Sequence, residues 1–235
     1  MKPRPSTAPK TTMTSTHPAG AVLPPPFHHL AWSNLAAQSA EQITLAAVPM
    51  VAVLALGAGP AETGFLAAMQ TLPFLLLSMP TGLLADRMSR RALMIAAEAL
   101  RALSLVGLVA FAATGGLTIG SLAVLGFAGA AGTVAFSVAA PALVPALVSR
   151  SALTSANGRL EFARSAAFAG GPALAGALVG WAGATAAFVA ATVLSTVAVS
   201  LLIRLREPAR PAAPRRQVLR ELHEGAAFLW KSRLL

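Results

Sequence analysis

Cysteine is absent from this chain of 235 residues, and charged residues make up only 11% of it. The lack of cysteine excludes a disulfide framework, a thiolate metal site and a cysteine nucleophile. The four histidines lie outside the long apolar segments, at His17, His28, His29 and His223. No Gly-x-x-x-x-Gly-Lys-Ser/Thr loop is present, which argues against an ATP-driven mechanism. We therefore expect no metal site, no cofactor and no enzymatic centre.

The scarcity of charge is matched by an excess of apolar residues. Hydrophobic residues make up 56% of the chain, whereas an average soluble domain is charged at roughly a quarter of its positions. Six apolar segments are close to or above the roughly 20 residues that cross a bilayer as a helix. These segments are 30–56, 62–85, 92–113, 117–148, 158–181 and 184–203. The sequence therefore predicts an all-α polytopic membrane protein, with a bundle of six transmembrane helices over residues 30–206.

The net charge of +10 raises the alternative of a nucleic-acid-binding protein. Aromatic residues make up only 6%, however, and the basic residues fall at the ends of the apolar segments. They gather in the N-terminal arm, the second and fourth connections and the C-terminal tail, while the other connections contain no Lys or Arg. By the positive-inside rule, this alternation predicts a multi-pass protein of the cell inner membrane with both termini in the cytoplasm. It explains the charge with membrane lipids and no nucleic acid as partners.

The two ends of the chain differ in composition from the apolar segments. Residues 1–29 are rich in Pro, Ser and Thr and carry basic residues, which predicts a disordered cytoplasmic arm. A signal peptide is the alternative, but the first apolar run begins far from Met1 and is too long for one. Residues 207–235 are expected to form a cytoplasmic linker.

The second connection reads Gly82-Leu83-Leu84-Ala85-Asp86-Arg87-Met88-Ser89-Arg90-Arg91. It resembles the loop between the second and third helices of major facilitator superfamily transporters, usually written G-x-L-a-D-R-x-G-R-R/K, and departs from it at Ser89. The resemblance implies that Gly82, Asp86, Arg87, Arg90 and Arg91 form a latch on the cytoplasmic gate. Asp86 would accept from Arg87 or Arg90, or face the N-terminus of a helix. The alternative is a basic membrane anchor with one solvated acid.

A second resemblance lies in the fifth apolar segment. Ala167-Phe168-Ala169-Gly170-Gly171-Pro172-Ala173-Leu174-Ala175-Gly176 is similar to the antiporter motif G-x-x-x-G-P-x-x-G-G, with matches at Gly171, Pro172 and Gly176. Close helix packing by small residues explains this stretch as well as antiport does. Together with Pro141-Ala142-Leu143-Val144-Pro145 and Glu224-Gly225-Ala226-Ala227-Phe228-Leu229-Trp230, it resembles the branch of drug, macrolide and siderophore exporters.

The superfamily resemblance implies a particular architecture and function. The six helices would form two inverted three-helix repeats, the N-terminal half of a twelve-helix fold. The implied function is proton-coupled efflux of small lipophilic molecules by alternating access. We expect the chain to be truncated before a seventh helix, with a second six-helix half in a missing region or a separate chain. The alternative is a membrane scaffold, partner subunit or inactive remnant that transports nothing alone.

Ionisable residues inside a membrane are costly, so each is a candidate for function. Glu41 lies near the middle of the first segment, with Asn34, Gln38 and Gln42 at helical spacing. This polar stripe is expected to face the transport cavity, where Glu41 would bind and release a proton. The alternative is a structural carboxyl that bonds neighbouring helices.

Two further pairs share the spacing Glu-x-x-Arg. Glu98 and Arg101 lie in the third segment, and Glu161 and Arg164 lie in the fifth. The spacing places each acid beside its base on one helix face, so each pair is expected to be neutralised within the bilayer. A structural role is favoured, although Arg164 is also a candidate to bind substrate in the cavity.

Overall fold

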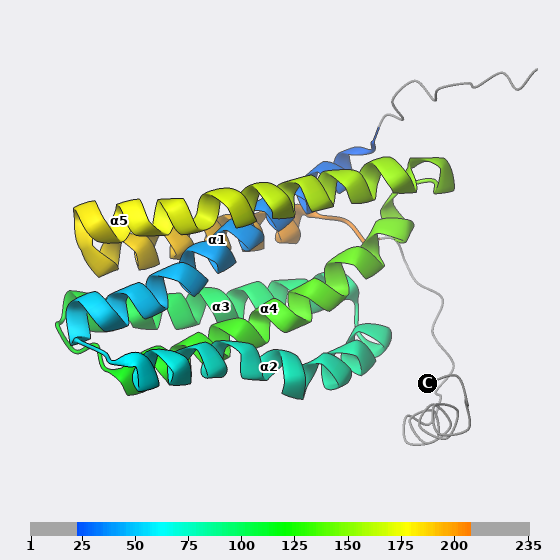
Figure 1. The fold of residues 1–235 in the computed structure, drawn as a ribbon. Helices are drawn as coiled ribbons and strands as arrows, with labels where there is room; N and C mark the ends of the chain where they lie inside the picture. The colour runs from blue at the N-terminus through cyan, green and yellow to red at the C-terminus, as the bar shows by residue number, and fades with distance from the viewer. Residues whose placement is uncertain (1–22, 208–235) are drawn as a thin grey trace, which may run out of the picture.

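The computed structural model describes residues 23–207. This part of the chain contains helices and no strand. The long helices run antiparallel to one another in chain order (Figure 1). They are α1 (Pro25–Leu56), α2 (Pro60–Arg87), α3 (Arg90–Ala113), α4 (Ile119–Leu147) and α5 (Leu153–Arg204), with the short 3₁₀ helix η1 (Arg150–Ala152) before α5. Each of the five long helices is long and apolar enough to cross a membrane.

The helix ends follow local sequence signals. Pro25 and Pro60 stand at the first positions of α1 and α2, where the missing N–H leaves no helical bond unmade. Gly57 ends α1 with a left-handed φ of 67°, which favours glycine. The helix α1 begins earlier than the predicted start at residue 30, because Pro25 and the residues after it can already adopt helical φ. The rest of the predicted arm, and the predicted linker beyond Glu207, lie outside the described residues.

The helix α5 contains two of the predicted apolar segments. Its residues are helical from 153 to 204 except at Gly183, whose φ of 80° and ψ of 174° break the helix. The chain reverses direction at the far left of Figure 1, and the two legs of α5 then lie side by side. A φ of this sign strains any residue with a Cβ, so Gly183 permits the reversal. The turn predicted at Trp181-Ala182-Gly183 is therefore found at this glycine.

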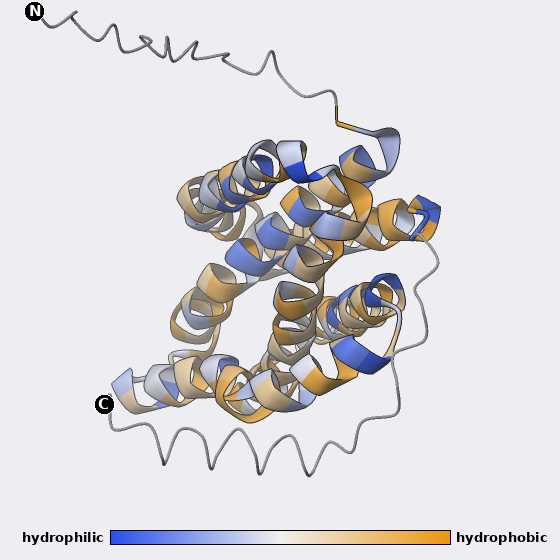
Figure 2. Ribbon diagram, turned by 90° about the vertical axis from the view of Figure 1, so that its right-hand side faces the viewer, coloured by the Kyte–Doolittle hydropathy of each residue, from blue (hydrophilic) through white to orange (hydrophobic). Residues whose placement is uncertain are grey.

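The outer surface of the bundle is apolar. Leu75 is 81% exposed, Phe162 76% and Trp181 91%. Apolar residues lie on the outward-facing as well as the inward-facing sides of the helices (Figure 2). A helix that is apolar all round fits a hydrocarbon surrounding or a second protein surface, and water suits it poorly. The described residues are thus those of a multi-pass membrane protein.

The interior is divided into two apolar clusters with a polar layer between them. One cluster joins the start of α1 and α3 to the ends of α4 and α5, and the other fills the opposite half of the bundle. The helix α1 packs chiefly against α5, while α4 packs against α2 and α3. The polar layer consists of Gln42, Glu98, Arg101, Ser104, Thr133 and Ser195, all of them buried. Its members come from α1, α3, α4 and the second leg of α5, and they lie near the middle of these helical segments.

Candidate functional site

The centre of the polar layer is an ion pair on α3. Arg101 Nη1 donates to Glu98 Oε1 at 2.6 Å, and the two side chains are 3% and 0% exposed. The pair lies on one face of the helix because its members are three residues apart. A charge placed here without its partner would be costly, because an apolar bundle cannot solvate it. The pair expected from the spacing is thus formed and fully buried.

Arg101 also joins α3 to two other helices. Its Nη1 donates to the Ala37 carbonyl of α1 at 3.0 Å, and its Nη2 donates to Thr133 Oγ1 of α4 at 2.5 Å. Thr133 in turn donates to the Gly129 carbonyl at 3.4 Å. The planar guanidinium has five donors in a fixed geometry, which suits it to several acceptors at once. One side chain therefore holds α1, α3 and α4 together at mid-height.

Gly132 brings α4 close enough for this contact. A Cβ at this position would stand 2.4 Å from the Ala97 carbonyl oxygen of α3. No real side chain tolerates such a distance, so only glycine lets the two backbones approach here. The next residue is Thr133, whose hydroxyl consequently reaches Arg101. The close approach of α3 and α4 thus sets the geometry of the polar layer.

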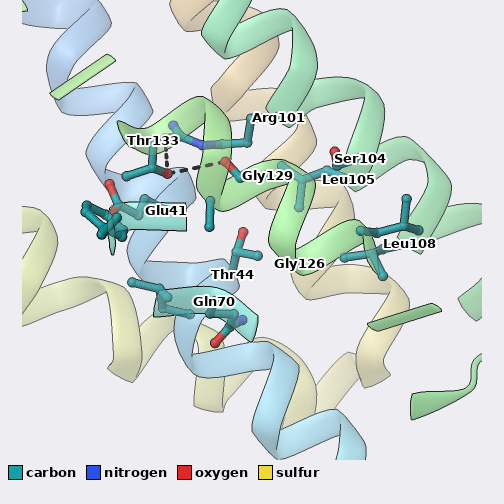
Figure 3. A pocket seen from close by; sticks show the side chains of 14 residues that line it. Glu41, Thr44, Gln70, Arg101, Ser104, Leu105, Leu108, Gly126, Gly129 and Thr133 are labelled. Atoms are coloured by element: carbon teal, nitrogen blue, oxygen red, sulfur yellow. Dashed lines mark hydrogen bonds between the residues drawn. The ribbon is translucent and has the colours of Figure 1, made fainter. Parts of the chain in front are cut away.

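A cavity of about 30 Å³ opens beside this cluster. Its polar lining comes from α1, α2, α3 and α4, with leucines and glycines between the polar groups (Figure 3). The polar residues of the lining are Glu41, Thr44, Gln70, Arg101, Ser104 and Thr133. A cavity needs at least roughly 10–15 Å³ to hold one water molecule, whose share of liquid volume is about 30 Å³, so this cavity has room for one or two waters. It is too small for a drug-sized molecule, whose pockets measure about 300–1,000 Å³.

The polar stripe of α1 is split between this cavity and α5. Glu41 lines the cavity, whereas Asn34 is buried and donates to the Leu160 carbonyl of α5 at 3.3 Å. Gln42 is buried against α5, and Gln38 is half-buried and is not part of the cavity lining. Of these four residues, Glu41 lines this cavity, while Asn34 and Gln42 contact α5 in the interior of the bundle. Successive residues of a helix are about 100° apart around its axis, so these four side chains contact more than one neighbouring helix.

At the basic end of the bundle, where the α2–α3 loop and the ends of α4 and α5 meet, α3 and α5 cap each other. Glu207 accepts from the backbone N–H of Arg90 at 3.3 Å and of Arg91 at 3.1 Å, the first residues of α3. Arg91 donates to the Leu202 carbonyl at 2.9 Å and to the Ile203 carbonyl at 2.6 Å, in the last turn of α5. Each charged group thus satisfies backbone groups that a helix end leaves unpaired.

The predicted latch residues have different surroundings in the loop. Arg90 donates to the Ala142 carbonyl of α4. Asp86 is exposed, and within residues 23–207 it makes no recorded hydrogen bond or ion pair, with Arg87 or otherwise. The acid that faces the N-terminus of α3 is Glu207. Ser89 has a φ of −64°, and its hydroxyl caps α3 by accepting from the Ala92 N–H, so this position does not require glycine.

Comparison with known proteins identifies the fold family. The family model of the Major Facilitator Superfamily matches residues 30–235. The chain belongs to the major facilitator superfamily. Members of this superfamily are membrane transporters, and they are not enzymes. None of the curated proteins compared with the chain matches it significantly.

In this superfamily member, Gly171 is the glycine of the antiporter-like stretch that packs closely against α1. A Cβ here would stand 2.4 Å from Gln42 Cβ, so α5 approaches α1 one residue beyond Glu41. Gly176 is in ordinary contact with Met50, at 3.8 Å from its Cε, while Gly180 has nothing within 4 Å. Pro172 is exposed on the outer side of α5. The stretch therefore acts as a packing surface against α1 at Gly171.

The second Glu-x-x-Arg pair is exposed on α5. Arg164 Nη1 and Glu161 Oε1 are 3.4 Å apart, and their side chains are 60% and 67% exposed. Neither residue is part of the lining of the small cavity beside Arg101.

Several residues of the site were not predicted. Thr133, Gln70 and Glu207 are contributed from helices or segments far from their partners in the sequence. Gly132 offered one signal, because it falls in a run of small residues at the middle of α4 that predicts a close helix contact.

Proposed function

We propose that this chain is the N-terminal half of a proton-coupled exporter of small lipophilic molecules, which works by alternating access. Glu41 is the residue that binds the coupling proton. The observation that carries the proposal is the position of Glu41 in a small polar cavity at mid-height of the bundle, beside the buried Arg101. Ionisable groups at this depth are rare and mark proton or substrate pathways.

The proposed topology has six crossings, with both ends of the chain in the cytoplasm. The reversal at Gly183 lets the two legs of α5 cross the membrane separately. The basic end of the bundle then lies in the cytoplasm, in agreement with the positive-inside rule. The opposite turns, residues 57–59 and 114–118, contain no Lys or Arg. The first three and last three crossings are proposed to form the inverted repeats.

The cargo is proposed to bind outside the small cavity. A volume of about 30 Å³ accommodates water or a proton-carrying group but no lipophilic cargo. The exposed part of α5 carries Phe162 and Phe168 beside the Glu161–Arg164 pair. Such a surface is costly against lipid because of the charges, and it suits a second six-helix half with cargo held between the two. Resemblance to drug exporters favours lipophilic cargo and the outward direction.

The experiment is an efflux assay with Glu41→Gln in cells that also produce the second half. Release of a panel of lipophilic fluorescent compounds is followed before and after an uncoupler collapses the proton gradient. We expect wild-type efflux to stop on uncoupling and the variant to show only the uncoupled rate. Glu62→Gln is the matched control, because Glu62 is an exposed acid at the start of α2 whose carboxylate accepts from the Gly59 N–H of its own helix end. Uncoupler-sensitive efflux by Glu41→Gln at the wild-type rate would contradict the proposal.

A further inference from the structure

The buried Glu98 carboxylate has one oxygen that is not used by the Arg101 ion pair. Glu98 Oε2 is buried and has no hydrogen-bond partner among the described residues, and the same holds for the Ser195 hydroxyl. The Ser195 hydroxyl of α5 neighbours this carboxylate. A buried acceptor without a donor is costly, and native structures seldom keep one without a reason. This oxygen lies outside the Arg101 ion pair, on a carboxylate that neighbours the Ser195 hydroxyl, and is therefore a place where a proton can be held.

The charges around the cavity do not balance when both nearby carboxylates are ionised. Glu41 from α1 and Glu98 from α3 are two acids, and among residues 23–207 Arg101 is the one buried base. Facing them from the other helices are uncharged groups, Gln70 of α2, Thr133 of α4 and Ser195 of α5. The next charge, Arg164, is paired with Glu161 on the exposed side of α5. One bound proton would make the buried group of three neutral, the state that an apolar bundle favours.

We propose that Glu41, Glu98 and Arg101 form one proton-binding site in which the two carboxylates share a single proton. Arg101 pairs with whichever carboxylate is ionised. In the structure it pairs with Glu98, and the proton then belongs to Glu41. In the second state Arg101 pairs with Glu41, and Glu98 holds the proton on a carboxylate that neighbours the Ser195 hydroxyl. The role of this site in transport rests on the proposed function, but the sharing of the proton does not.

The geometry places Arg101 within reach of both helices. Its Nη1 already contacts the Ala37 carbonyl, one helical turn before Glu41 on α1. The cavity between Glu41 and Arg101 has room for one or two waters to carry the proton (Figure 3). The proton moves from Glu41 to Glu98 as the guanidinium moves the other way, so the total charge is unchanged. The exchange alters the bonds between α3 and α1, which links proton position to helix arrangement.

Infrared spectroscopy of the purified full chain in lipid nanodiscs at neutral pH tests whether Glu41 and Glu98 share one proton. The carbonyl stretching band of a protonated carboxyl group is measured in wild type, Glu41→Gln and Glu98→Gln. We expect a band in wild type and its loss in both variants, because either remaining carboxylate would pair with Arg101 and ionise. Arg101→Gln leaves two carboxyls without a base and should give about twice the wild-type band. Arg101→Lys keeps the charge and should retain the wild-type intensity.

Glu161→Gln is the control, since it breaks an acid–base pair of the same spacing on the exposed side of α5. It should leave the band unchanged. A wild-type band that persists in Glu98→Gln would overturn the sharing and assign the proton to Glu41 alone, with the proposed coupling role of Glu41 intact. Absence of the band in wild type would also overturn it. Loss of the band in both variants, combined with normal uncoupler-sensitive efflux by Glu41→Gln, would keep the shared site and refute the proposed function.

Discussion

Arg101 and Glu98 form an ion pair of 2.6 Å with side chains 3% and 0% exposed, at the middle of α3 and between two apolar clusters. A buried pair of this kind contributes little net stability compared with apolar residues of the same size. Removing one member is a different matter, because it leaves a charge or a polar group in the bundle without a partner.

Arg101→Met is therefore expected to lower the free energy of unfolding by about 3 kcal/mol. The double variant Glu98→Leu with Arg101→Met removes both charges and should fall within about 1 kcal/mol of wild type. Denaturant unfolding of the detergent-purified chain measures both. Equal destabilisation of the single and double variants would show that the bonds of Arg101 to Ala37 and Thr133 matter more than its charge.

Gly132→Ala is expected to destabilise the bundle by about 1–3 kcal/mol, because its Cβ would collide with the Ala97 carbonyl and force α3 from α4. Gly158→Ala is the matched control, since this helical glycine has nothing within 4 Å of a built Cβ. In a helix interior, alanine is favoured over glycine by up to about 1 kcal/mol. Thermal unfolding should thus separate the two variants in opposite directions. Unchanged thermal stability of Gly132→Ala would mean that α3 and α4 can move apart at no cost in free energy.

Gly171→Ala should push α5 from α1 at Gln42, next to Glu41, and impair uncoupler-sensitive efflux. Its neighbour Gly170 supplies the control, because a Cβ there meets nothing within 4 Å. Protein amount in the membrane is measured with efflux, so that loss of fold is separated from loss of transport. If Gly170→Ala and Gly171→Ala behave alike, close packing of α5 on α1 has no role in the cycle.

Two variants at the basic end of the bundle distinguish a contact that stabilises the fold from one that acts in gating. Glu207→Gln removes the negative charge that bonds the N-terminus of α3 and should lower the free energy of unfolding by about 1 kcal/mol. Asp86→Asn should leave stability unchanged, because Asp86 is exposed and has no recorded partner among the described residues. If Asp86 belongs to a latch with the second half, its variant should still slow transport. Unfolding and efflux measured on both variants distinguish a cap from a latch.

The local features of the fold could be predicted from the sequence, because they depend on residues close together in the chain. The apolar segments overlap the helices, the break falls at Gly183, and Glu98 contacts Arg101 three residues away. The contacts between distant segments could not. Nothing near Asp86 in the sequence indicates that Glu207 bonds the start of α3. Likewise, the helical spacing places the four polar residues of α1 on one stripe, but in the structure Asn34 and Gln42 contact α5.

The most direct test of proton coupling is exchange of cargo for protons in sealed vesicles that contain the assembled transporter. A pH-sensitive dye inside the vesicles reports proton movement when a transported lipophilic compound is added on the cytoplasmic side. Wild type is expected to move protons in the opposite direction to the cargo, while Glu41→Gln moves none. Cargo-dependent proton movement at the wild-type rate in Glu41→Gln would contradict the assignment of Glu41 as the coupling residue.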